Sequence, residues 1–254
     1  MFGPMSSFRM TNPTITVRAS AFPARAIVAA IGSPLAHELE RARRIARANG
    51  SALHVLPPDE HAGPGAWAFA VSDLAEDVRA SLVVVAPERG RFGGSFAERV
   101  HEIADRAVLQ VRNPVTGPYE EVFIATVPRS SFASLTAAAR YVANGARRVE
   151  FLHAYTSPSE SILRSQGAGF VTIQHYRRQA EAEARERLLS AFDDARLDPS
   201  DLHLEHGPAA LVLSEVPSRA LLVIERGRSR IKHLAFGSVT RAVLASCRAD
   251  VLVV

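Results

Sequence analysis

Two copies of one pattern run through most of the chain. The segment GSFAERVHEIADRAVLQV, starting at Gly94, aligns without a gap with GSVTRAVLASCRADVLVV, starting at Gly237. The tetrapeptide ERGR precedes both segments, at Glu88 and again at Glu225, and each time it follows a run of valine, leucine and isoleucine. Matched segments of this length are typical of repeated structural units. The sequence therefore predicts a duplication.

The earlier parts of the two copies also correspond. IVAAIGSPLAHELERARRIARANGSALHVL, from Ile27, parallels FIATVPRSSFASLTAAARYVANGARRVEFLHA, from Phe123, and both contain the tripeptide ANG. Each copy begins with an apolar run rich in β-branched residues and continues with a helical pattern, which predicts an α/β fold with parallel sheets. We expect two tandem domains, at 25–112 and 119–254. The proline and glycine residues between them suit a linker.

The second copy is the more complete one. It predicts strands near 121–127, 148–154, 202–206, 220–224 and 251–254, and helices near 130–144, 175–196, 208–216 and 237–247. The first copy lacks the long second helix and the third strand, so we expect a truncated domain. Serines at the helix starts, namely Ser33 and either Ser130 or Ser131, are predicted to be caps. Residues 1–24 have scattered glycine, proline and serine, and we expect a poorly ordered leader.

Composition excludes several classes of function. Apolar runs are far shorter than the roughly 20 residues of a membrane-spanning helix, which predicts no membrane partner. Of the 30 basic residues, set against 26 acidic ones, all but Lys232 are arginines, and they are too dispersed to indicate a nucleic-acid surface. The single cysteine, Cys247, is expected in the core, and a cytoplasmic location follows most simply. The nine histidines show no metal-ligand spacing, and no catalytic residues are recognisable.

At its C-terminal end the chain resembles the universal stress proteins. Gly227, nine residues, Gly237 and Ser238 match the glycine-rich motif of that family, and a helix and a strand of Val-Leu-Val-Val type follow. The stretch HGPAALVLSEVPSRALLVI, at 206–224, looks like the family's turn, third helix and fourth strand. With the first copy included, the resemblance covers nearly everything after residue 24. It implies two Rossmann-like domains that pair through their VLQV and VLVV edge strands.

The resemblance also implies a place for ATP, with Mg²⁺, in the second copy. Glycines let the backbone approach phosphate, and amides at a helix start point toward an anion. The candidate nucleotide-binding residues, carried over from the family motif, are Val127, Gly207, Gly227, Arg228, Gly237, Ser238 and Val239.

Two departures argue that this site is weak or lost, and the first copy departs further from the motif. The first glycine of the motif falls on Ile224, whose side chain is expected to crowd a bound phosphate. The acidic residue usual at the end of the first strand falls on Val127. In the first copy Ile31 takes the acidic position, and only three residues separate Gly90 from Gly94.

Three interpretations stay open at this point. The first is a non-enzymatic regulatory protein with weak or lost ATP binding, no required cofactor and no metal. The second is an ATP- or AMP-binding switch, or a slow ATPase, that uses the second copy. The third is an enzyme whose active residues come together only in the fold. A protein partner of unknown identity, or a homodimer, fits the truncated first copy, because a shortened sheet exposes an apolar edge.

Overall fold

The computed structural model describes residues 26–31, 37–57, 64–87, 96–226 and 237–254. Its strands are β1 (Ala26–Ala30), β2 (Ala52–Leu56), β3 (Leu82–Val85), β4 (Ala107–Gln110), β5 (Glu121–Ala125), β6 (Arg148–Tyr155), β7 (Leu202–His206), β8 (Leu221–Ile224) and β9 (Asp250–Val253). Its helices are α1 (His37–Asn49), α2 (Pro64–Asp77), α3 (Phe96–Ala104), α4 (Phe132–Val142), α5 (Glu160–Ser165), α6 (Phe170–Ala195), α7 (Ala209–Ser214) and α8 (Ser238–Ser246), with a 3-10 turn at Pro199–Asp201.

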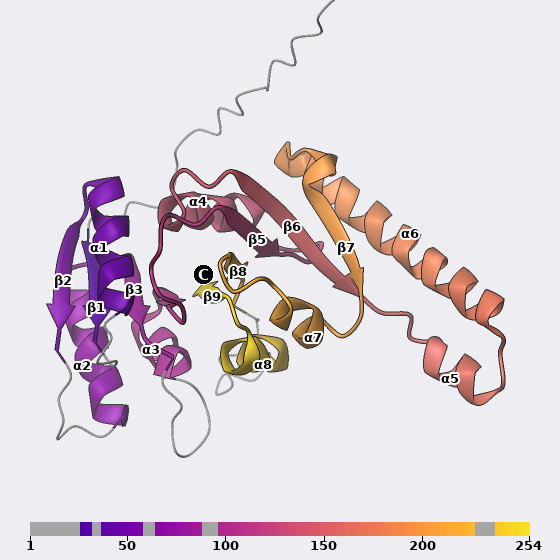
Figure 1. Cartoon of the computed structure of the whole chain (residues 1–254), viewed down its shortest axis with the longest axis horizontal. Helices are drawn as coiled ribbons and strands as arrows, with labels where there is room; N and C mark the ends of the chain where they lie inside the picture. Colours follow the sequence, from indigo (N-terminus) through magenta and orange to yellow (C-terminus); the bar gives the residue numbers. More distant parts are fainter. Residues whose placement is uncertain (1–25, 32–36, 58–63, 88–95, 227–236) are drawn as a thin grey trace, which may run out of the picture.

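All of these strands form one sheet in the order β2-β1-β3-β4-β9-β8-β5-β6-β7 (Figure 1). Neighbouring strands are parallel except β4 and β9, which are antiparallel. Helices α1, α4 and α6 contribute to the core on one face, and α2, α3, α7 and α8 contribute to the core on the other. The predicted α/β class with parallel strands is confirmed.

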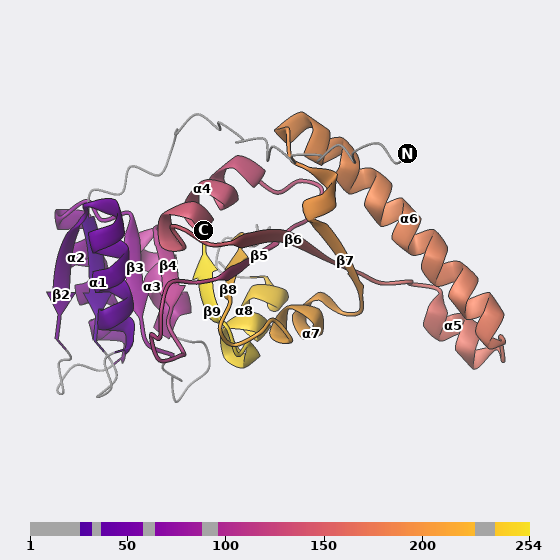
Figure 2. The same cartoon turned by 45° about the horizontal axis from the view of Figure 1, so that its top comes forward.

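The contact between β4 and β9 joins the two repeated segments. Val108 pairs with Val253, Leu109 with Leu252, and Gln110 with Val251. These are the VLQV and VLVV strands, so the predicted edge-to-edge contact is confirmed. Because the contact continues the sheet, strands from both segments share one hydrogen-bonded layer (Figure 2).

The two ANG tripeptides meet on the α1 and α4 face. Asn49 Nδ2 donates to the Tyr141 carbonyl at 2.9 Å, and Asn144 Nδ2 donates to the Ala48 carbonyl at 3.4 Å. Each asparagine therefore satisfies a carbonyl at the end of the other helix, where backbone acceptors lack partners within their own helix.

The element boundaries correct several predictions. Helix α6 begins at Phe170, five residues before the predicted 175, and α5 was not predicted. Ser131 does lie at the N-cap of α4, but it makes no side-chain cap bond, since its Oγ donates to Ser134 Oγ. Cys247 is buried, as predicted. Ser33 lies outside the described residues.

Candidate functional site

The predicted nucleotide-binding residues that the structure describes lie at the carboxyl edge of the C-terminal strands. Val127 follows β5 and is 52% exposed, and Gly207 follows β7. Gly237 is the N-cap of α8, and Ser238 and Val239 form its exposed first turn. Gly227 and Arg228 lie outside the described residues. Strand order brings these positions to one edge, where open parallel sheets place ligands.

Two backbone N–H groups at this edge already donate hydrogen bonds to other groups of the protein. Gly207 N–H donates to the Tyr155 carbonyl at 2.8 Å, and the φ of Gly207, +154°, is one that side chains rarely adopt. The N–H of Val127 donates to Ser130 Oγ at 3.0 Å. The first-turn amides of α8 are therefore the groups best placed for an anion, because a helix N-terminus concentrates unpaired donors.

Ile224, the last residue of β8, is part of the core. Its side chain is 4% exposed and belongs to the apolar cluster that includes Val243 and Val253. Removing it would open a cavity beneath α8, and core isoleucines cost about 2–5 kcal/mol to truncate. An Ile224→Gly variant would therefore lose stability, whatever it did to a ligand.

Beyond β6 and β7, the same edge holds a polar cluster that the sequence did not predict. Glu160, at the start of α5, accepts from Arg177 at 2.6 and 2.8 Å and from Arg164 Nε at 3.0 Å, and it lies 3.4 Å from His206 Nε2. Hydrogen bonds from Arg177, followed by those from Arg164, lower the pKa of Glu160 to about 2. Glu160 therefore ties α5 to α6 and to the end of β7.

Glu160 is expected to make the α5–α6 pair sensitive to acid. Its folded pKa lies below its unfolded value, so its stabilising effect is complete above about pH 4.5 and is lost as the pH falls toward 2. The urea midpoint of the wild type should drop more between pH 5 and pH 3 than that of Glu160→Gln. Glu183→Gln, on the exposed face of α6, is the matched control and should behave like the wild type. Equal drops in all three proteins would contradict the assignment.

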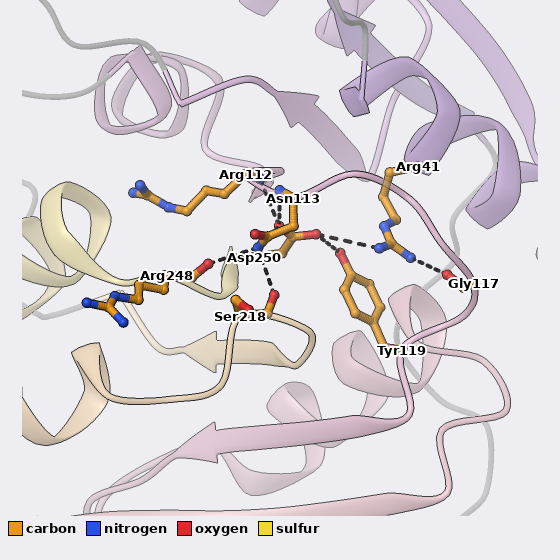
Figure 3. Close-up of polar contacts among 8 residues, drawn as sticks. All are labelled: Arg41, Arg112, Asn113, Gly117, Tyr119, Ser218, Arg248 and Asp250. Carbon is orange, nitrogen blue, oxygen red and sulfur yellow. Dashed lines mark hydrogen bonds and ion pairs between the residues drawn. The ribbon is translucent and has the colours of Figure 1, made fainter.

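A second unpredicted cluster surrounds Asp250, the first residue of β9 (Figure 3). Its carboxylate is 1% exposed. Oδ1 accepts from the backbone N–H of Arg112 at 2.7 Å and of Asn113 at 3.2 Å, and Oδ2 accepts from Tyr119 Oη at 2.6 Å. Burial, and then the charge of Asp250, raise the pKa of Tyr119 well above its usual value. Tyr119 therefore stays protonated and donates.

Arg41 connects this cluster to α1. Its Nη2 lies 3.7 Å from Asp250 Oδ2, its Nη1 donates to the Gly117 carbonyl at 3.0 Å, and its guanidinium lies 3.8 Å from the centre of the Tyr119 ring (Figure 3). Asn113 Nδ2 also donates to the Ser218 carbonyl at 2.7 Å. The segment between β4 and β5 is thus held to both repeated segments at once. The sequence signal was Asp250 itself, which stands where the first copy has Ala107.

The described residues contain no group of three or more His, Cys, Asp or Glu side chains that could hold a metal ion. Over the same part of the chain, no helix is both long and apolar enough to span a bilayer. The chemistry present at the two clusters is ion pairing and hydrogen bonding among protein groups.

Comparisons with known proteins agree with this architecture. A structure of a functionally unknown protein from Pseudomonas aeruginosa PAO1 superimposes with a TM-score of 0.60 at 16% identity, covering 91% of this chain and 92% of that one. A proposed universal stress protein from Pseudomonas aeruginosa UCBPP-PA14 gives a TM-score of 0.62 at 19% identity, covering 91% and 93%. No curated protein matches the sequence. The model of the universal stress protein family matches residues 126–254, about half of the chain, and the chain therefore belongs to that family.

Proposed function

We propose that the protein is a stress-response regulator of the tandem universal stress type, in which 25–112 and 119–254 are two copies of one domain paired within one chain. The register between β4 and β9 supports this proposal most directly. Leu109 and Leu252 are aligned in the repeat, and they lie directly opposite each other. Such a register is the one that a twofold axis between two copies would produce.

The contact between α3 and α8 supports the same arrangement. Glu98 and Arg241 occupy aligned positions in the repeat, and their side chains lie 3.8 Å apart. In a dimer of identical copies, each of these residues would meet its own like charge near the axis. A duplicated chain can place opposite charges there, which favours pairing within the chain.

We further propose a cytoplasmic protein without catalytic activity, in which ATP binding is weak or lost. Val127 offers no acidic group at the end of β5, and Ile224 fills the core where the motif has glycine. Tyr155 and Gly207, also at this edge, bond to protein groups. An ATP- or AMP-binding switch, or a slow ATPase, is the second candidate, and the exposed first turn of α8 is the observation that favours it.

Calorimetric titration with MgATP, together with a phosphate-release assay, tests this proposal. The wild type should show no saturable heat up to about 1 mM nucleotide and no turnover, because Val127 supplies no acidic group and Ile224 replaces a glycine of the motif. Ser238→Ala is the variant that probes the site, since Ser238 is exposed and lies among the predicted nucleotide-binding residues. Micromolar binding that Ser238→Ala weakens would overturn the loss of the site and establish the second candidate.

A further inference from the structure

The two strands at the ends of the sheet, β2 and β7, differ in chemistry (Figure 1). On β7 the side chains of His203 and Glu205 are hydrogen-bonded at 2.9 Å, and both are 53% exposed. β2 has the sequence Ala-Leu-His-Val-Leu, with no acid, lysine or arginine, and Val55 is 42% exposed. Charged side chains discourage edge strands from pairing with other chains, and β7 carries a carboxylate of this kind whereas the residues of β2 do not.

The free edge of β2 presents backbone groups at alternate residues. Ile31 N–H donates to the Leu56 carbonyl at 3.1 Å, so the polar backbone groups of Leu56 face β1. Because these groups alternate along a strand, those of Leu53 and Val55 face away from β1. No hydrogen bond from another described residue reaches them, since β2 pairs with β1 alone. Pro57 follows the strand and lacks an N–H group, so the row of free backbone donors ends at Val55.

The chain itself shows how such an edge can be covered. Strand β6, which occupies the corresponding place in the second repeat, pairs with β7, whereas no other described strand lies on the outer side of β2. Strands β4 and β9 join edge to edge in antiparallel fashion, with aligned leucines opposite each other. Two copies of one edge that meet about a twofold axis run antiparallel, and each then supplies free backbone groups at the same spacing.

We propose that β2 pairs with β2 of a second copy of this chain, antiparallel, about a twofold axis at His54. In this register Leu53 lies opposite Val55 of the second copy, and each such pair exchanges both N–H···O bonds. Apolar side chains then face apolar side chains across the junction, while His54 faces its own copy in a pair without hydrogen bonds. This inference does not depend on the proposed function, because it uses only the edge of the N-terminal segment.

A disulfide trap tests the register in the full-length protein. Cα atoms in such a non-hydrogen-bonded pair are about 4.5 Å apart, and disulfides form at about 4.4–6.8 Å. We expect His54→Cys to give at least about tenfold more covalent dimer on a non-reducing gel than Val55→Cys or His203→Cys. The native Cys247 is buried and does not compete. Equal cross-linking of all three variants would overturn the proposed register.

Sedimentation velocity tests the interaction without new cysteines. A five-residue edge predicts a weak dimer, so the wild type is measured from about 10 to 500 µM, where its sedimentation coefficient should rise. Val55→Lys should weaken the dimer at least about tenfold, because it places a charge within the apolar pair, and His203→Lys on β7 should leave it unchanged. A wild type that stays monomeric, or a dimer that survives Val55→Lys, would refute the proposal.

Discussion

Replacing Asp250 with alanine is expected to lower the free energy of unfolding by about 3–5 kcal/mol, because it leaves buried partners without their acceptor. Arg41 would lose the carboxylate 3.7 Å from its guanidinium, and the Tyr119 hydroxyl would lose the bond that it makes at 2.6 Å. The backbone N–H groups of Arg112 and Asn113 would also lose this partner. Each buried polar group left unsatisfied costs about 1–3 kcal/mol.

Urea unfolding followed by circular dichroism measures this loss, and two further variants separate its causes. Tyr119→Phe removes one hydroxyl and should cost about 1–3 kcal/mol. Asp194→Ala removes an exposed carboxylate from α6 and should change stability by less than about 0.5 kcal/mol. If Asp250→Ala cost no more than Asp194→Ala, the cluster would have no role in holding the two segments together.

The Asp250 cluster is a feature of the fold that the sequence did not predict. The repeat predicted the strands, because hydrophobic period and aligned motifs are local signals. The pairing of β4 with β9 was implied by the resemblance to the universal stress proteins. It did not predict that Asp250, Tyr119 and Arg41 converge, since these residues are far apart in the chain and meet only through the sheet order. Asp250 differs from its aligned Ala107, and that single difference was the available clue.

For the nucleotide motif, the sequence predicted some positions correctly and others incorrectly. The sequence correctly located Gly237 and Ser238 at the start of α8. It treated Ile224 as an obstruction beside a phosphate, whereas the structure places its side chain in the core cluster. Glu160 was missed because α5 has only six residues, and so short a helix carries almost no periodic signal.

The N-terminal segment expressed alone, as residues 25–112, is expected to aggregate or to unfold without a cooperative transition. In the full chain the described residues of β4 are almost fully buried, with Val108 and Leu109 at 0% exposure, and β9 covers one edge of that strand. Helix α3 packs against α8, and Asn49 reaches the Tyr141 carbonyl of α4. Cutting the chain would expose β4 as a bare apolar edge, and such an edge pairs with other chains.

The fragment would also keep the outer edge of β2, which no other described strand covers, so that its four described strands would present two open edges. It would lose Asp250 as well, and with it the counter-ion of Arg41. Residues 119–254 are the matched fragment, because they retain five strands and helices on both faces. Thermal melting and light scattering compare the two. A soluble 25–112 fragment that melts cooperatively would show that this segment is stable alone, and that the β4–β9 contact is not required for its fold.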